Sequence, residues 1–471
     1  MTPDEFRRLG HQLIEWVAAY REGMGKLPVM SQVKPGQIRA QLPSTPPPRG
    51  ESLDGLPAEL DQLILPGITH WNHPRFFAYF PSNTDLASVL ADLIASGLGP
   101  NAMSWQTSPA ATEVEEVTLE WLRQMVGLPD TFTGSLQDTA STCALVALLC
   151  ARERSTQYSQ TRGGLQAEDV PLVVYASDQA HSSVEKAALL AGFGRQHVRA
   201  IPTDDQHALR MDLLRAAVTE DLANGRRPCA MVASIGTTAT TAVDPLAEVV
   251  KLAAEVGAWV HVDAALAGTA MVVPSCRSHW AGVAGADSLV LNPHKWMGAG
   301  FDCSAYYVRD PQHLIRVMST NPTYLRTAHD AEVKNYRDWG VQLGRRFRAL
   351  KLWMVIRNEG VEGIVARIER DLEYARGFAR TIDQAAPEWE RLAPVPFQTV
   401  CIRHRPAGLE GAALDAHNLA LANAVNATGQ AYVTPSVVKG VQLIRVSFGA
   451  TATQPQDVDA LWALLRQTAA R

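Results

Sequence analysis

The stretch AWVHVDAALAG, residues 258–268, is a short apolar run that stops at an acidic residue. Three other runs share its character: PLVVYAS at 171–177, CAMVASI at 229–235 and SLVLN at 288–292. All four are rich in β-branched residues and almost unbroken in apolarity. This pattern is typical of parallel strands that are buried on both faces of a sheet.

Helical patterns separate these runs. MDLLRAAVTEDLANG (211–225) ends in glycine, and PLAEVVKLAAEVG (245–257) opens with proline and closes with glycine, as helices commonly do. Strand and helix alternate from about residue 115 to residue 308. We therefore predict an α/β fold with a doubly wound, mostly parallel central sheet flanked by helices.

The two ends of the chain have different patterns. Residues 4–23 carry a helical apolar stripe and lead into the proline-rich connector PSTPPPRG (43–50), which indicates an arm that packs on something else. After about residue 360 the sequence predicts a long helix, two or three strands and a final helix. The expected domains are an N-terminal helical arm (1–85), a large α/β domain (86–360) and a small α+β domain (361–471).

Composition narrows the class of protein. The chain has 471 residues, 46% of them hydrophobic, and a net charge of −5 without a dense Lys/Arg run, which argues against nucleic acid as a partner. Its six cysteines form no CxxC pair, and neither a HExxH motif nor a cysteine cluster suggests a metal. The N-terminus lacks a signal-peptide core, and no stretch reaches the roughly 18 apolar residues of a membrane span. We expect a soluble cytoplasmic protein.

Polar residues follow the predicted strands where each strand ends. Asp263 closes one strand, and Lys295, in LNPHKWMG (291–298), lies just past another. The carboxyl ends of parallel strands meet at one edge of the sheet, where ligands commonly bind. Alone, Asp263 would more often be a helix cap and Lys295 an ordinary surface cation.

Two further features of the sequence favour a ligand site at this edge of the sheet. Thr139, Ala140 and Ser141 precede a helical apolar run, so that backbone N–H groups would converge on an anion. His181 likewise lies at a strand-to-helix junction. A lysine amine, a carboxylate, an imidazole and an anion site are the parts needed to hold pyridoxal phosphate, since the amine bonds the aldehyde and the carboxylate keeps the pyridine nitrogen protonated.

The sequence resembles the pyridoxal-phosphate-dependent aromatic L-amino-acid decarboxylases of group II, most closely the bacterial L-DOPA decarboxylase type. The resemblance covers almost the whole chain and is carried by HPRFFAYFPSNTDLASVLADL (73–93), SDQAHSSVEKAALLAG (177–192), NPHKWMGAGFDCSAYYVRD (292–310) and LGRRFRALKLWMVIRNEGVEG (343–363). It implies fold type I of the pyridoxal-phosphate enzymes. It also implies a homodimer with active sites at the subunit interface, in which the N-terminal arm packs on the partner.

The resemblance also implies roles for individual residues. Lys295 corresponds to the lysine that bonds the cofactor, Asp263 to the partner of the pyridine nitrogen, and His181 to the ring that stacks on the cofactor and assists protonation. Further implied cofactor contacts are Thr139, Ala140, Ser141, Thr238, Ala265, Asn292 and His294. The family more often has serine where this chain has Thr139, which keeps the hydroxyl.

Substrate contacts follow from the same resemblance. Trp71, Tyr79, Phe80 and Pro81 would line a slot for an aromatic side chain, although core packing explains such an aromatic run equally well. Asn101 and Met103 would reach in from the second subunit, where the family usually has bulkier or more apolar residues. Gly344 matches a position where glycine leaves room for an indole and a larger residue favours phenols.

Tyr324 decides between two reactions. It lies in NPTYLRTAHDAEVKNYRDWG (321–340), a polar stretch that is typical of a loop closing over a site. In the family a tyrosine here protonates the substrate carbon after carbon dioxide leaves, whereas phenylalanine accompanies oxidative formation of aldehydes. We therefore expect decarboxylation of DOPA, tyrosine, phenylalanine, tryptophan or 5-hydroxytryptophan to the amine.

Three alternatives remain open. An aromatic acetaldehyde synthase would use the same scaffold and cofactor. Decarboxylation of glutamate or histidine would require a polar pocket in place of Trp71 and Phe80. A protein that binds the cofactor without turnover is disfavoured, because the residues Lys295, Asp263, His181 and Tyr324 are all present.

Overall fold

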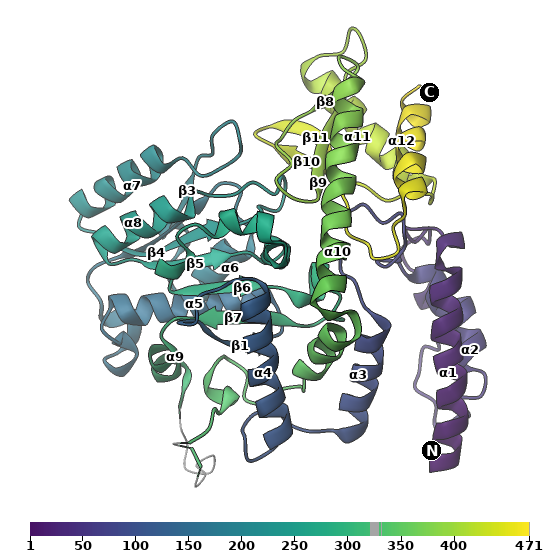
Figure 1. The fold of residues 1–471 in the computed structure, drawn as a ribbon, viewed down its shortest axis with the longest axis horizontal. Helices are drawn as coiled ribbons and strands as arrows, with labels where there is room; N and C mark the ends of the chain where they lie inside the picture. The colour runs from purple at the N-terminus through teal and green to yellow at the C-terminus, as the bar shows by residue number, and fades with distance from the viewer. Residues whose placement is uncertain (321–328, 331, 471) are drawn as a thin grey trace. The chain divides into compact units, whose positions relative to one another are not determined.

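The computed structural model describes residues 1–320, 329–330 and 332–470 of the chain (Figure 1). Its helices are α1 (Pro3–Gly23), α2 (Leu56–Glu59), α3 (Leu86–Leu98), α4 (Pro109–Met125), α5 (Ala140–Ser155), α6 (Ser183–Leu190), α7 (Met211–Ala223), α8 (Leu246–Val256), α9 (Pro311–Met318), α10 (Ala349–Gln384), α11 (Gly411–Ala427) and α12 (Pro455–Ala469). Its strands are β1 (Thr133–Gln137), β2 (Leu172–Ser177), β3 (Val198–Ile201), β4 (Arg227–Ser234), β5 (Trp259–Asp263), β6 (Ser288–Leu291), β7 (Ser304–Val308), β8 (Trp389–Arg391), β9 (Thr399–His404), β10 (Thr434–Val438) and β11 (Val441–Ser447).

The described chain forms two compact units. Unit 1 comprises Met1–Pro81, Arg380–Leu392 and Cys401–Arg471, and unit 2 comprises Ser82–Ala379 and Ala393–Val400. Each unit is described by itself below. The expected packing of residues 1–85 on a partner subunit stays a prediction.

Unit 2 is built on a sheet in the order β1-β7-β6-β5-β4-β2-β3. The pairs β2–β3, β2–β4, β4–β5 and β5–β6 are parallel, and β7 runs antiparallel to both of its neighbours. The predicted doubly wound, mostly parallel sheet is therefore confirmed, and all four apolar runs form strands. The sequence-based prediction did not include β1, β3 or the antiparallel β7.

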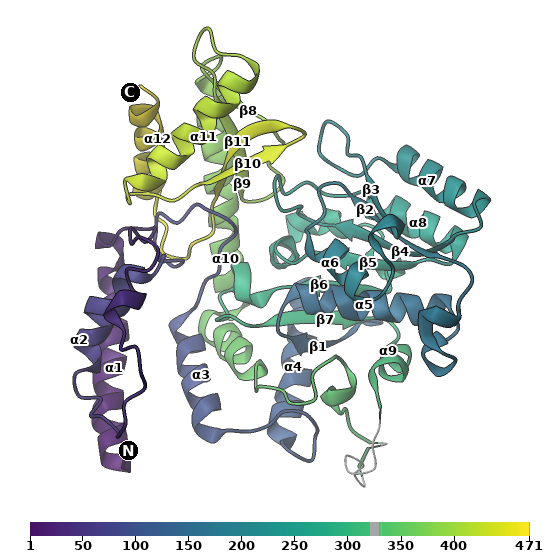
Figure 2. The same cartoon turned by 180° about the vertical axis from the view of Figure 1, so that it is seen from behind.

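Helices cover both faces of this sheet (Figure 2, the view opposite to that of Figure 1). Val174 of β2 belongs to the buried cluster that also contains the α5 residues, whereas the hydroxyl of the next residue, Tyr175, donates to Asp221 of α7 at 2.9 Å. Because successive side chains of a strand point to opposite faces, α5 and α7 lie on opposite faces of the sheet.

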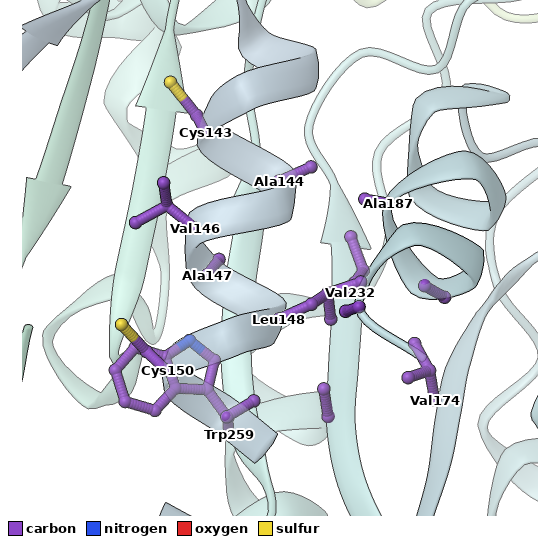
Figure 3. Packing of buried hydrophobic residues seen from close by; sticks show 14 of the residues in the cluster. Cys143, Ala144, Val146, Ala147, Leu148, Cys150, Val174, Ala187, Val232 and Trp259 are labelled. Carbon is purple, nitrogen blue, oxygen red and sulfur yellow. The ribbon is translucent and has the colours of Figure 1, made fainter. Parts of the chain in front are cut away.

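The core of unit 2 is centred on α5. Figure 3 shows Cys143, Val146, Ala147 and Cys150 of this helix among residues of the strands, including Trp259 of β5. All of these side chains are at least 99% buried. This packing fixes α5 on the face of β5 that carries Trp259 and therefore also His261 and Asp263.

Unit 1 contains α1, α11, α12 and a four-stranded sheet in the order β10-β11-β9-β8. The sequence predicted two or three strands here, and the sheet has four; β8 spans only three residues and shows no readable alternation. The predicted helices at 4–23 and from about 455 correspond to α1 and α12. The predicted long helix is part of α10, which is kinked at Gly360.

Two chemical properties complete the description. All six cysteines are free and buried. None of the helices in the described part of the chain is long and apolar enough to cross a membrane.

Candidate active site

Lys295 lies in a single π-helical turn, Pro293–Met297, immediately after β6. Its N–H donates to the carbonyl of Asn292 at 3.0 Å, and its carbonyl accepts from the N–H of Asn83 at 3.2 Å. The next residue, Trp296, is fully buried and donates from Nε1 to Asp371 at 2.8 Å. The half-buried lysine therefore has a main chain held on both sides.

Asp263 ends the neighbouring strand β5. Its Oδ1 accepts from the N–H of Ala265 at 3.1 Å, so the carboxylate forms the kind of turn that an ordinary strand-terminal aspartate makes. The carbonyl of Asp263 accepts from Ile235 at 2.9 Å, and the carbonyl of Ala265 accepts from Asn292 at 3.0 Å. The chain segments bearing Asp263 and Lys295 are thus bonded to each other at one edge of the sheet.

His181 lies between β2 and α6 and is near both charged residues. Its Nδ1 lies 2.7 Å from Oγ of Ser183 and 3.2 Å from the N–H of the same residue, so Ser183 holds this side of the ring. Desolvation of the ring lowers the pKa of His181, Asp263 acts in the opposite direction, and Lys295 adds to the lowering. The structure therefore brings together the three residues that the sequence predicted separately.

The N-terminus of α5 is a candidate anion site. Thr139 is its N-cap residue but makes no side-chain capping bond, so the first-turn amides at Ala140 and Ser141 face outward from the helix end. These amides and the positive end of the helix dipole favour an anion. Cys143, one turn further on, has its pKa raised by burial, then by Asp138 and Asp263, which shows that this helix start is close to the carboxylate.

Ser304 connects the anion site with the lysine turn. Its Oγ lies 2.7 Å from Oδ1 of Asn292 and 3.2 Å from the carbonyl of Asp138. Asn292, expected as a phosphate contact, is therefore 98% buried and bonded beside the start of α5. The sequence did not indicate Ser304, because it lies on the antiparallel strand β7, which was not predicted.

Two other predicted cofactor contacts have different surroundings. Thr238 is exposed in the loop 235–243 between β4 and α8, and it is not a helix cap, since α8 begins at Leu246. His294 is 96% buried, and its Nδ1 accepts from the N–H of Cys303 at 2.9 Å. Burial, and then Lys295, lower the pKa of His294 to about 4. Contacts of Thr238 and His294 with a cofactor stay predictions.

The aromatic residues predicted for the substrate slot lie in unit 1. The rings of Trp71 and Tyr79 are stacked with their centroids 5.5 Å apart, and both residues are exposed. Tyr432, which the sequence did not indicate, packs edge-on to Tyr79 at 5.8 Å. Phe80 lies under the guanidinium of Arg445 at 4.9 Å, and Pro81 is buried.

Asn101 and Gly344, two other predicted substrate contacts, meet in unit 2. Asn101 accepts at Oδ1 from the N–H of Arg345 at 3.1 Å, and a Cβ at Gly344 would lie 3.8 Å from its Nδ2. The carbonyl of Met103 accepts from Arg337 at 2.8 Å. Tyr324 lies outside the described residues.

These residues fit pyridoxal phosphate. An uncapped helix N-terminus suits the phosphate, and a carboxylate, an amine and an imidazole lie together at the same sheet edge. No group of three or more metal-ligating side chains occurs in the described ranges. The arrangement suits chemistry at an amino acid that is bonded to the cofactor.

Comparisons with known proteins give the same assignment. Residues 35–405 match the model of the pyridoxal-dependent decarboxylase conserved domain. The chain is 39% identical to a phenylacetaldehyde synthase of Arabidopsis thaliana and 37% identical to tryptophan decarboxylase 2 of Oryza sativa subsp. japonica, covering all of this chain and 96% of each relative. A crystal structure of Oryza sativa TDC with PLP and tryptamine superposes with a TM-score of 0.96 and 37% identity, over all of this chain and 98% of that chain. The chain belongs to the pyridoxal-dependent decarboxylase family.

Proposed function

We propose that this protein decarboxylates aromatic L-amino acids to the aromatic amine and carbon dioxide. The observation that carries the proposal is the grouping of Lys295, Asp263 and His181 beside the uncapped start of α5. The relatives named above, a tryptophan decarboxylase and an aromatic aldehyde synthase, support an aromatic substrate. The closer likeness to the bacterial L-DOPA type stays a prediction, since these relatives are plant proteins.

Each residue has a defined task in this proposal. When bound, the cofactor supplies an aldehyde and a protonated ring that withdraws electrons from the carbon losing its carboxyl group. Lys295 anchors that aldehyde through Nζ, and Asp263 holds the proton on the ring nitrogen. His181 presents its ring face to the cofactor and is held at Nδ1 by Ser183.

The remaining cofactor contacts hold the group in place. Thr139, Ala140 and Ser141 bind the phosphate with the amides and hydroxyls at the start of α5, and Asn292, whose Oδ1 lies 2.7 Å from Ser304 Oγ, is a further phosphate contact. The small Ala265 leaves room for the ring. Thr238 and His294 complete the set that we propose.

The substrate side rests on the aromatic residues. Trp71, Tyr79 and Phe80 with Pro81 would bind the aromatic side chain. Asn101 and Met103 would reach in from the second subunit, and Gly344 would leave room for an indole. We propose that Tyr324 delivers the proton to the substrate carbon once carbon dioxide has left. The products are then one amine and one carbon dioxide for each amino acid consumed.

Replacement of the lysine tests the proposal. The wild-type protein should show the visible absorbance of bound pyridoxal phosphate, and borohydride should fix the cofactor to Lys295 in a peptide map. Lys295→Ala should lose the covalent attachment and amine formation, while Lys186→Ala, an exposed lysine of α6, should keep both. Attachment to another lysine, or none, would contradict the proposed function. A screen of DOPA, tyrosine, phenylalanine, tryptophan and 5-hydroxytryptophan then identifies the substrate.

A second activity is favoured by one observation, the 39% identity to a phenylacetaldehyde synthase. That reaction consumes one oxygen and one water for each amino acid, and forms aldehyde, carbon dioxide, ammonia and hydrogen peroxide. With Tyr324 present we expect amine as the main product. Tyr324→Phe should shift the products towards aldehyde and peroxide, and unchanged product ratios would refute the role of this tyrosine.

We also propose a homodimer that works in the cytoplasm. Helix α3 exposes Leu86, Leu90, Leu93, Ile94 and Leu98, an apolar stripe at helical spacing that a second copy would cover. Six free thiols suit a reducing compartment. Light scattering should give twice the chain mass, and Leu90→Asp should shift the protein towards monomer and reduce activity.

A further inference from the structure

The loop 235–243, which carries Thr238, is closed by its own hydrogen bonds. The N–H groups of Gly236 and Thr237 both donate to the carbonyl of Ala242 at 3.0 Å, and Ala242 donates back to Oγ1 of Thr237 at 3.0 Å. Ile235 and Val243 form a bridge at the base of the loop. The shape of the loop therefore depends on how its two ends are held.

Asp244 holds both ends. Its N–H donates to the carbonyl of Ser234 at 2.9 Å, and its Oδ2 accepts from the N–H of the same residue at 2.8 Å. Its Oδ1 accepts from the N–H of Leu209, in the segment before α7, at 2.9 Å. The Asp244 carboxylate thus bonds the end of β4 and the segment before α7. Asp244 itself lies just before α8, so three chain segments meet at this side chain.

Burial of the Asp244 carboxylate costs folding free energy. Asp244 is 99% buried, and burial raises its pKa to about 7. The backbone donors Ser234 and Leu209 limit this rise of the pKa, and the carboxylates of Asp204 and Asp178 contribute a smaller part of it. A carboxylate with this desolvation cost depends on its hydrogen bonds, and such buried bonds make the local structure rigid.

The Ser234–Ile235 peptide, which Asp244 holds, is hydrogen-bonded to the main chain of Asp263. Ser234 is the register partner of Asp263 in the β4–β5 pair, and the N–H of Ile235 donates to the carbonyl of Asp263 at 2.9 Å. The peptide between Ser234 and Ile235 is therefore held by Asp244 on one side and holds the main chain of Asp263 on the other.

We propose that Asp244 is a positioning residue of the cofactor site, which fixes the Thr238 loop and the main chain of Asp263 without touching cofactor or substrate. The inference rests on the proposed function, since it concerns the same site. Asn at this position keeps the shape but has only one oxygen, so one of the two bound amides must face an NH₂ group.

The test compares Asp244→Asn with Asp221→Asn. Asp221 is a second buried carboxylate of unit 2, and it bonds Arg199, Arg226 and Tyr175 instead of the loop. Titration of the apoprotein with pyridoxal phosphate, followed by absorbance, should give about tenfold weaker binding for Asp244→Asn, because one buried hydrogen bond is lost. Asp221→Asn should lower the melting temperature at least as much but leave the affinity unchanged.

A double-mutant cycle distinguishes a positioning role of Asp244 from a general loss of stability. If Asp244 acts through the loop, Asp244→Asn combined with Thr238→Ala should bind the cofactor no more weakly than the worse single variant, whereas independent effects would multiply. Wild-type affinity and absorbance spectrum in Asp244→Asn would overturn the inference.

A second variant covers a failure of Asp244→Asn to fold. Thr237→Val removes the Oγ1 acceptor inside the same loop while keeping the side-chain shape, and should weaken cofactor binding by about threefold. Unchanged affinity in that variant would also overturn the inference. A wild-type protein that does not bind the cofactor at Lys295 would contradict the proposed function itself, which distinguishes the two failures.

Discussion

Arg345 and Glu115 form a two-point ion pair inside unit 2, with Nη2 2.7 Å from Oε1 and Nη1 3.1 Å from Oε2. Both side chains are at least 96% buried. The same guanidinium donates to the carbonyls of Ala102 and Leu136, and the N–H of Arg345 donates to Asn101. The pair therefore holds the Asn101 segment, β1 and the segment after Gly344 together.

We expect Glu115→Gln to destabilise the protein strongly, because it leaves the Arg345 charge buried without its counter-ion. Losing one partner of a buried pair costs about 3–5 kcal/mol of unfolding free energy. The matched control is Glu255→Gln, which breaks the exposed pair with Arg215 and should change the unfolding free energy far less, because solvent screens this pair. Urea unfolding followed by tryptophan fluorescence measures both, and equal losses would contradict the importance of the buried pair.

Gly236 should not tolerate a side chain. It lies in the loop 235–243 with φ +89°, and a Cβ there would lie 2.7 Å from the Cβ of Ala267. Gly257→Ala is the control, since Gly257 has φ +72° and no heavy atom within 4 Å of an added Cβ. We expect Gly236→Ala to cost about 1–3 kcal/mol more than the control, as overpacking does, and to release cofactor more readily. Equal melting temperatures for the two variants would show that the loop moves aside freely.

Stability in acid should depend on His73. This residue is 98% buried, its Nδ1 accepts from the N–H of Arg75 at 2.9 Å, and burial lowers its pKa from 6.5 to about 4. As the pH falls below 6.5 the unfolded chain takes up this proton before the folded chain does. The stability contributed by the neutral ring is therefore full above pH 6.5 and is lost as the pH falls towards 4.

His73→Asn tests this assignment, because its Oδ1 can replace the ring nitrogen as acceptor but does not titrate. The unfolding free energy of the variant should fall less steeply between pH 6.5 and 4, by up to about one bound proton. Denaturant titrations at several pH values measure the slope. A slope identical to that of the wild type would assign the acid sensitivity to other groups.

Gly344→Ser should change substrate preference without harming the fold. An added Cβ would lie 3.8 Å from Asn101 Nδ2, an ordinary contact, so there is room for a small side chain. If this position borders the aromatic group, the ratio of kcat/KM for tryptophan to that for tyrosine should fall by about tenfold. Gly363→Ser, in helix α10, is the control and should leave the ratio unchanged. No change in either variant would remove Gly344 from the substrate site.

The sequence predicted the sheet edge well because local patterns define it. Apolar runs mark the strands of a parallel sheet, so Asp263 and Lys295, each just after such a run, had to lie at the same edge. The helix start at Thr139 was readable for the same reason. Their grouping with His181 was less readable, because His181 follows β2, which β4 separates from β5 in the sheet.

Other parts of the site depend on contacts between residues far apart in the chain. Ser304 contacts Asp138 across 166 residues, and it does so because β7 inserts antiparallel between β1 and β6. The roles of Asp244 and Arg345 depend on which amides and carboxylates their side chains reach after folding. Local periodicity carries no signal for such partners.

The burial of every native thiol has a practical consequence. Burial raises the pKa of Cys143, Cys150, Cys229, Cys276, Cys303 and Cys401, so none offers a ready thiolate to an alkylating reagent. The native cysteines of the folded protein should therefore not react with a thiol label. A single cysteine engineered at the surface would carry a fluorophore or spin label at one chosen position, with no native thiol to remove first.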